Sequence, residues 1–116
     1  MERGNRFTAM DRPIRAAILC TMGTTSRCLA EKIQTAAGAH GIPLQISAAS
    51  VAEFEEIAPE LDVLLLEPQV RHHQKSFAKT AALYGLPLAV VEPRAFATMN
   101  GDRVLQQMLD LLKRDA

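Results

Sequence analysis

Cys20 combines a reactive side chain with a position that suits anion binding. It ends the apolar run of residues 14–19, and small and hydroxylated residues follow it before a helical pattern begins near Thr24 or Thr25. The start of a helix presents N–H groups and the positive end of the helix dipole, which attract anions and favour a thiolate. A thiol in this position can take up a phosphoryl group.

The loop after Cys20 has the composition expected of a phosphate site. Gly23 lets the backbone approach a ligand closely. Four hydroxyl groups can donate hydrogen bonds to phosphate oxygens, those of Thr21, Thr24, Thr25 and Ser26. Two plainer interpretations stay open, because a cysteine at the end of a strand can simply fill space and Thr25 or Ser26 can simply cap the helix.

The remaining cysteine and the histidines give no sign of a metal centre or cofactor. Cys28 falls in the middle of the predicted helix beside Leu29, so we expect an inert, buried thiol. The spacing of the two cysteines is neither that of a CxxC redox pair nor that of a metal-ligand pair. His40 and the adjacent pair His72 and His73 do not supply metal geometry, and we expect the pair to be solvated or to contact a partner.

Composition narrows the class of protein. The chain has 116 residues and a formal net charge of zero, which argues against a general nucleic-acid binder. No apolar run approaches the about 18 residues of a membrane span, and the first residues lack the apolar core of a signal peptide. We therefore expect a cytoplasmic protein with reduced thiols and no inserted segment, consisting of a flexible arm over residues 1–12 and one domain over 13–116.

Short apolar runs alternate with helical patterns along this domain. Strands are predicted at 14–19, 42–48, 62–66 and 87–91, and helices at 24–39, 51–58, 68–84 and 99–113. Right-handed crossovers would give an α/β three-layer sandwich, with a four-stranded parallel sheet in the order 2-1-3-4 and helices on both faces. Ligands bind such sheets at the carboxyl ends of strands where the order reverses. Cys20, Glu67 and Glu92 all follow strands at that edge.

Three segments then resemble the cellobiose/lactose-type enzyme IIB of the bacterial sugar phosphotransferase system. The stretch over residues 16–26 is similar to the family's strand, cysteine and Ser/Thr-rich helix start, and residues 62–71 are similar to its "LLGPQVR" segment. Residues 87–91 and 99–105 resemble its last strand and the entry to its last helix. The resemblance covers about residues 14–113, in order and without large gaps.

The resemblance implies a fold similar to that of low-molecular-weight tyrosine phosphatases, and a phosphotransferase mechanism. Cys20 would accept phosphate from a phosphohistidine of enzyme IIA and pass it to a sugar, of the β-glucoside, cellobiose, chitobiose or lactose class, bound in the membrane permease IIC. The same resemblance implies a phosphate cradle and a docking surface. The cradle would consist of Thr21, Met22, Gly23, Thr24, Thr25 and Ser26, and the docking surface of Pro68, Gln69 and Arg71.

Glu67 stands where the family often has glycine. A carboxylate there would oppose thiolate formation and phosphate binding unless it points away, and the N-cap of the helix that begins at Pro68 is its expected place.

Two other functions compete with that of a carrier. A low-molecular-weight phosphatase has an arginine six residues after its nucleophile, whereas here that position is Ser26 and Arg27 follows one residue too late. Since one residue turns a helical side chain by about 100°, Arg27 is expected to face solvent. Glu92-Pro93 resembles that enzyme's acid loop. The second alternative is a non-catalytic regulatory domain on the same fold.

Overall fold

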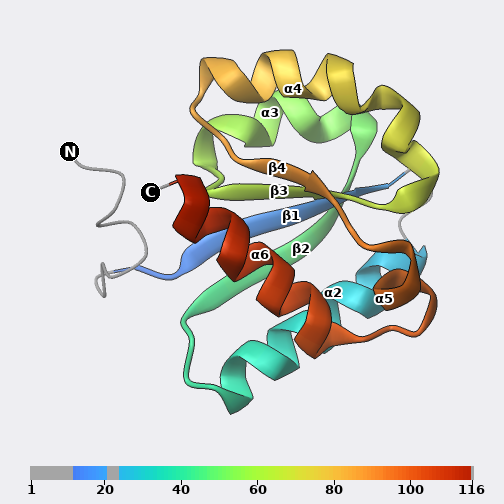
Figure 1. Ribbon diagram of the computed structural model, residues 1–116. Coiled ribbons are helices and arrows are strands. Elements are labelled where there is room, and N and C mark those ends of the chain that lie inside the picture. Colours follow the sequence, from blue (N-terminus) through green and yellow to red (C-terminus); the bar gives the residue numbers. More distant parts are fainter. Residues whose placement is uncertain (1–11, 21–23, 116) are drawn as a thin grey trace.

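The computed structural model describes residues 12–20 and 24–115, with side chains for 12–20 and 26–113. Four parallel strands form one sheet in the order β2-β1-β3-β4 (Figure 1). The predicted fold class and strand order are therefore confirmed. The strands are β1 (Ile14–Cys20), β2 (Leu44–Ser50), β3 (Val63–Leu66) and β4 (Leu88–Val90).

Helices cover both faces of this sheet (Figure 1). One face carries α3 and α4, and the other carries α2, α5 and α6. All four residues of β3 are buried, as expected of an apolar run covered on both sides. The α-helices are α2 (Thr24–Ala39), α3 (Phe54–Ile57), α4 (Gln74–Leu83), α5 (Pro93–Ala97) and α6 (Gly101–Asp115), and the 3-10 helices are η1 (Val51–Glu53), η2 (Ala58–Glu60) and η3 (Pro68–His73).

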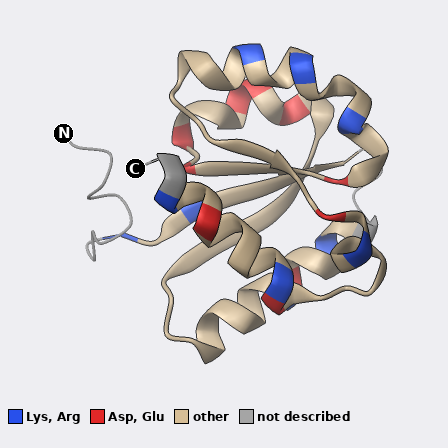
Figure 2. Cartoon of the chain, viewed as in Figure 1, with Lys and Arg blue, Asp and Glu red and all other residues tan. Residues whose placement is uncertain are grey.

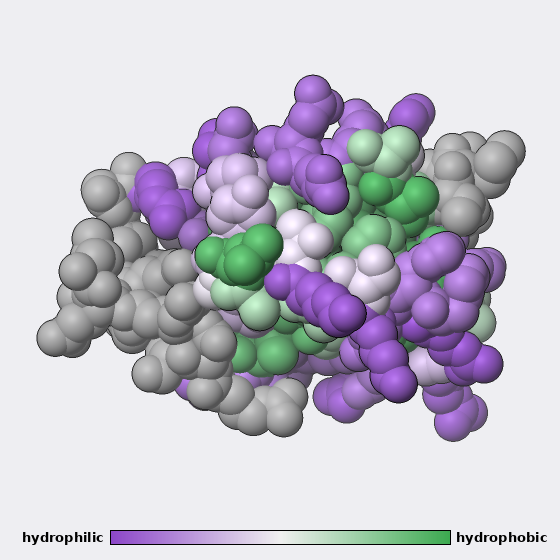
Figure 3. Space-filling model, turned by 90° about the horizontal axis from the view of Figure 1, so that it is seen from above, coloured by the Kyte–Doolittle hydropathy of each residue, from purple (hydrophilic) through white to green (hydrophobic). Residues whose placement is uncertain are grey.

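One apolar core lies on each side of the sheet. The larger joins α2 and α6 to the sheet and includes Ile18, Ile33 and Met108. The smaller lies under α3 and α4 and includes Phe54 and Val70. Seen from the α3 and α4 side, hydrophilic side chains dominate the rim of the molecule, and apolar ones show near its middle (Figure 3).

Three helix predictions need correction. The helix expected at 51–58 is a chain of short turns, η1, α3 and η2, with Pro59 near the start of η2. The helix expected at 68–84 begins as the 3-10 helix η3. Val70 in this segment is buried, and its N–H donates to the backbone carbonyl of Glu67. The helix α5 was not predicted; it has only five residues, and Pro93 occupies its first turn.

Glutamine side chains cover both edges of the sheet. Gln34 from α2 donates from Nε2 to the carbonyl of Leu44 at 2.6 Å and accepts from the N–H of Ile46 at 3.1 Å. Gln107 from α6 does the same on β4, with 2.9 Å to the Val90 carbonyl and 3.2 Å from the Glu92 N–H. In each case a side-chain amide bonds the strand as a neighbouring strand would, which keeps the edge from pairing elsewhere.

Arg12, the first described residue, is tied to the start of β3 through Asp62. Its guanidinium donates to both carboxylate oxygens of the buried Asp62, at 2.8 and 3.0 Å. Asp62 also accepts the N–H of Arg15 at 2.9 Å. Most of the expected arm, residues 1–11, lies outside the described part of the chain, whereas Arg12 itself is fixed to the domain.

Candidate functional site

Cys20 is the last residue of β1, at the edge of the sheet where the strand order reverses. Its side chain is buried, with 1% of the residue exposed, and Sγ lies 3.5 Å from the carbonyl oxygen of Ala49 on β2. A carbonyl can only accept, so this contact holds a protonated thiol. The resting side chain is therefore a sheltered thiol, and it must lose this proton to act as a nucleophile.

The helix that follows Cys20 lies where the sequence predicted it. α2 begins at Thr24, four residues after the cysteine, and its 16 residues give it a full helix dipole. Thr21, Met22 and Gly23 lie outside the described residues, as do the side chains of Thr24 and Thr25. Of the six residues predicted to cradle phosphate, Ser26 alone has a described side chain.

Ser26 directs its hydroxyl to Glu67. It is fully buried, and Oγ donates to Glu67 Oε2 at 2.5 Å. Because a hydroxyl carries a single proton, Ser26 would meet an anion with its backbone N–H while this contact lasts. Glu67 occupies the N-cap position of η3, as expected, but its side chain makes no capping hydrogen bond and reaches across to α2 instead. Sequence reasoning missed this contact between β3 and α2.

The prediction for Cys28 was wrong. This cysteine is exposed on α2, not buried. Leu29 and Ile33 define the buried face of the helix, and one residue before Leu29 is a turn of about 100° away from it. Arg27 is also exposed, which matches the expectation that it lies on the solvent side.

The three residues predicted to dock a partner lie together. Pro68, Gln69 and Arg71 line an open hollow of about 600 Å³ with His72 and Pro93, beyond the ends of β3 and β4. Gln69 and Arg71 are exposed. The adjacent His72 and His73 are exposed as well, with ring centroids 4.0 Å apart. The hollow therefore opens on the same edge of the sheet as Cys20.

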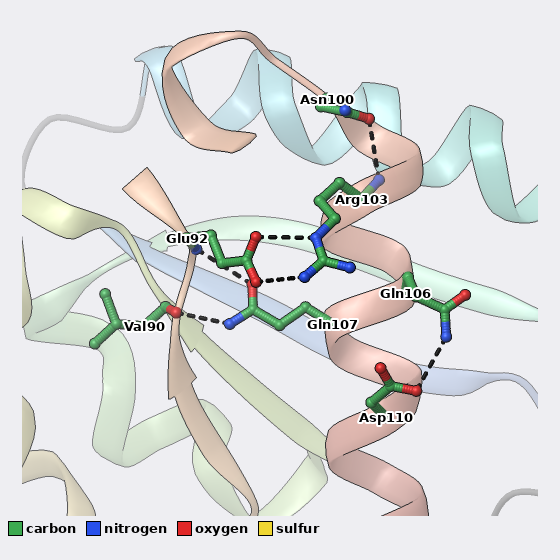
Figure 4. A network of polar contacts seen from close by, with 7 residues as sticks. All are labelled: Val90, Glu92, Asn100, Arg103, Gln106, Gln107 and Asp110. Atoms are coloured by element: carbon green, nitrogen blue, oxygen red, sulfur yellow. Dashed lines mark hydrogen bonds and ion pairs between the residues drawn. The ribbon is translucent and has the colours of Figure 1, made fainter. Parts of the chain in front are cut away.

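A second acid, Glu92, follows β4 on this edge. Figure 2 shows acidic residues just past the ends of β3 and β4. Arg103 of α6 donates to both carboxylate oxygens of Glu92, at 2.9 and 2.7 Å (Figure 4). These hydrogen bonds hold the pKa of Glu92 below its ordinary value and raise the pKa of Arg103. The charge of Glu92 is thus directed to α6.

The described part of the chain shows neither a metal cluster nor a membrane-spanning helix. The described residues contain no group of three or more His, Cys, Asp or Glu side chains that could hold a metal ion. Among the helices within residues 24–115, none has the length and apolar character needed to cross a bilayer.

The fold and site define a class of proteins, doubly wound α/β domains with a cysteine between the first strand and the first helix. Within that class the sequence is specific. The profile of the lactose/cellobiose-specific IIB subunit family of the phosphotransferase system (PTS) matches residues 15–107. The chain belongs to this family, and its resemblance to enzyme IIB is confirmed.

Individual relatives agree with this assignment. The galactose-specific EIIB component of Lactococcus lactis subsp. cremoris is 34% identical over 101 residues, which are 83% of this chain and 94% of that protein. The cellobiose-specific EIIB component of Lactococcus lactis subsp. lactis matches with the same identity and coverage. A lactose-specific EIICB component of Lactococcus lactis subsp. lactis is 27% identical over 85 residues, only 15% of its own length.

Solved structures share the fold. The lactose-specific IIB domain of Streptococcus pneumoniae superposes with a TM-score of 0.78 at 20% identity, covering 85% of this chain and 97% of that one. The cellobiose-specific IIB protein of Borrelia burgdorferi gives 0.75 at 24% identity, covering 91% and 97%. The arrangement of the sheet and helices is therefore that of known IIB domains.

Proposed function

We propose that this chain is a cytoplasmic phosphoryl carrier of a sugar phosphotransferase system. Cys20 accepts the phosphoryl group from a phosphohistidine of enzyme IIA and passes it to a sugar bound in the membrane enzyme IIC. The observation that carries the proposal is the place of Cys20, at the end of β1 and four residues before the N-terminus of α2. Membership of the IIB family supports it.

Each of the two transfers exchanges one bond to phosphorus for another. In the first, the S–P bond forms as the N–P bond of phosphohistidine breaks, and the thiol proton ends on the imidazole nitrogen that leaves. In the second, a sugar hydroxyl oxygen attacks phosphorus, the S–P bond breaks, and the hydroxyl proton returns to sulfur. The first transfer requires the contact between Cys20 and Ala49 to break, because that contact holds the proton.

The start of α2 favours negative charge on a phosphorylated Cys20. α2 begins four residues after Cys20, so its N–H groups and the positive end of its dipole are expected near the sulfur, and the predicted cradle of residues 21–26 precedes and opens this helix. Because Cys20 is buried, attack at the usual approach distance of about 3–3.5 Å requires the sulfur to become accessible when the donor docks.

The hollow lined by Pro68, Gln69 and Arg71 is the proposed docking surface. It opens on the edge of the sheet where β1 ends, so a protein seated there lies at the same edge as Cys20. Exposed Arg71 offers a positive charge to a phosphorylated, negatively charged donor. Relatives named lactose-specific EIICB support IIC as the second partner. Together with the galactose-specific and cellobiose-specific EIIB relatives, they support a sugar of the cellobiose, galactose or lactose class.

The decisive experiment compares the two cysteines. Wild type, Cys20→Ser and Cys28→Ser are each incubated with the general phosphoryl-donor proteins, carrying labelled phosphate, and with each of several IIA proteins. We expect a labelled adduct on wild type and on Cys28→Ser, since Cys28 lies outside the site, and none on Cys20→Ser. An adduct that survives Cys20→Ser, or none with any IIA, would refute the proposal. Rapid Cys20-dependent hydrolysis of p-nitrophenyl phosphate would instead assign a phosphatase.

A further inference from the structure

Glu67 and Cys20 hold equivalent places on neighbouring strands. Ile18 of β1 is paired in register with Leu65 of β3, and Cys20 and Glu67 each follow two residues later. Ile18 and Leu65 both belong to the core on the α2 side, and side chains two residues apart on a strand share a face. Since parallel strands lie about 4.8 Å apart, the carboxylate and the thiol start from adjacent positions on one face of the sheet.

The contact with Ser26 keeps Glu67 on that face. Ser26 is the third residue of α2, and its hydroxyl bonds the carboxylate at the end of the helix that favours anions. Only 6% of Glu67 is exposed. A charge held among buried groups is poorly screened by water, so it acts strongly on a neighbouring site.

We propose that Glu67 sets the phosphoryl-transfer potential of Cys20, because its buried carboxylate raises the free energy of negative charge on the sulfur. The effect falls on the thiolate and on the phosphocysteine alike. It keeps the resting side chain as the thiol that donates to Ala49, and it drives the phosphoryl group onward once it has been accepted. The part that concerns phosphocysteine rests on the proposed function, whereas the part that concerns the thiolate does not.

Other described charges near Cys20 are more exposed than Glu67. On the β2 side, Ser50 pairs in register with Cys20 and donates to Glu53, whose carboxylate lies in solvent. The cations on the adjoining elements, Arg27 on α2 and Arg71 on η3, are exposed too. Glu67 is therefore the carboxylate expected to dominate the field at the sulfur.

Coulomb's law sets the scale of the effect. For a separation of about 6 Å, a little more than one strand spacing, and an effective dielectric constant near 20, two unit charges change an equilibrium by a factor on the order of 100. Sharing of the charge with Ser26 and residual screening reduce this factor. We expect removal of the charge to favour the thiolate at least tenfold, which moves the midpoint of its titration down by about one pH unit or more.

The first test is a titration of Cys20 alone. Cys28→Ser leaves one cysteine, and the ultraviolet absorbance of its thiolate is followed against pH with and without Glu67→Gln. The glutamine keeps an oxygen that accepts from Ser26 and removes only the charge. The control is Glu92→Gln, the acid that ends β4, two strand spacings or about 10 Å from β1. We expect a lower midpoint for Glu67→Gln and little change for Glu92→Gln.

Two further variants separate charge from structure. Ser26→Ala keeps the carboxylate and removes its hydrogen bond, so its midpoint should not fall. If Glu67→Gln does not fold, the double variant Ser26→Ala/Glu67→Ala replaces it, because removal of both partners leaves no orphaned polar group. An unchanged midpoint in every folded variant that lacks Glu67, or an equal fall in Glu92→Gln, would overturn the proposal.

The second test measures the phosphoryl equilibrium with IIA. We expect Glu67→Gln to hold at least ten times more phosphocysteine relative to phosphorylated IIA than wild type does, and Glu92→Gln to match wild type. A wild-type chain that accepts no phosphate contradicts the proposed function but leaves the thiolate titration to judge Glu67. A lower thiolate midpoint with an unchanged phosphoryl equilibrium contradicts the proposed control of transfer potential.

Discussion

At Gly101 the backbone of α6 lies against the backbone of α2, with no room for a side chain. A Cβ at this position would lie 2.5 Å from the carbonyl oxygen of Lys32 and 2.6 Å from its carbonyl carbon. Both atoms belong to the backbone of α2, so no flexible side chain can move aside. Gly101→Ala therefore forces the two helices apart along a contact that buries Ile33 and Val104. Overpacking of this kind costs about 1–3 kcal/mol.

Two other glycines provide matched controls. Gly38 lies inside α2 with nothing within 4 Å of an added Cβ, so Gly38→Ala should stabilise the protein by about 0.5–1 kcal/mol through helix propensity. Gly41 is equally open but has φ +68°, so Gly41→Ala should cost about 1–2 kcal/mol through backbone strain alone. The three positions separate crowding, propensity and backbone conformation.

Urea unfolding of the wild type and the three variants measures these differences. We expect equal m-values and a free energy of unfolding that falls for Gly101→Ala and Gly41→Ala and rises for Gly38→Ala. Each kcal/mol should move Tm by on the order of 4 °C in a domain of this size. If Gly101→Ala is as stable as Gly38→Ala, the close approach of the two helices is not a constraint, and the reasoning fails.

Two more predictions concern the edge and the network shown in Figure 4. Gln107→Leu uncovers β4 and should raise light scattering on mild heating, whereas Gln106→Leu, on the exposed side of the same helix, should raise it much less; equal scattering would contradict the role of the amide. Arg103→Gln should raise the pKa of Glu92 in an NMR titration, because the folded-state pKa is held down by Arg103. A carboxyl group whose folded-state pKa is lowered stabilises the fold at pH values above its unfolded-state pKa, and this stability is lost as pH falls through the folded-state pKa. The difference in stability between wild type and Arg103→Gln should therefore shrink as pH falls below 4.5; a constant difference would contradict this.

The order of elements could be predicted from sequence because short apolar runs, most clearly those of β1 and β3, alternate with helical patterns. Val63–Leu66 is apolar at every position, which only a strand covered on both faces tolerates, and the connections are long enough for right-handed crossovers. Local turns were less predictable. The helix predicted at 51–58 begins where expected, with Glu53 accepting from the N–H of Ser50, yet it does not continue regularly beyond Phe54–Ile57. A local signal fixes where a helix begins, whereas tertiary packing decides how far it runs.

The candidate site was predictable only in part. Cys20 stood out because a thiol at the end of an apolar run and before a helix is unusual in type and place. The contact between Ser26 and Glu67 joins residues 41 positions apart, and no periodicity or motif carries that information. The prediction of a buried Cys28 was wrong for a different reason. The apolar pattern of α2 defines the buried face only to within one residue, and one residue along the helix turns the side chain out of the core.

A phosphatase and a carrier make opposite demands on a phosphocysteine. A phosphatase needs a cation around the phosphate and an acid at the leaving group, but Arg27 is exposed on α2 and Glu92 is held by Arg103 about two strand spacings from β1. A carrier needs to exclude water and still release the group to its acceptor. Burial of the Cys20 side chain serves the first need. The charge of Glu67 serves the second, because it makes the phosphocysteine a better donor. Burial of Cys20 and the charge of Glu67 are thus the two features that would suit a carrier, and Glu67→Gln should make the phosphoryl group harder to pass on.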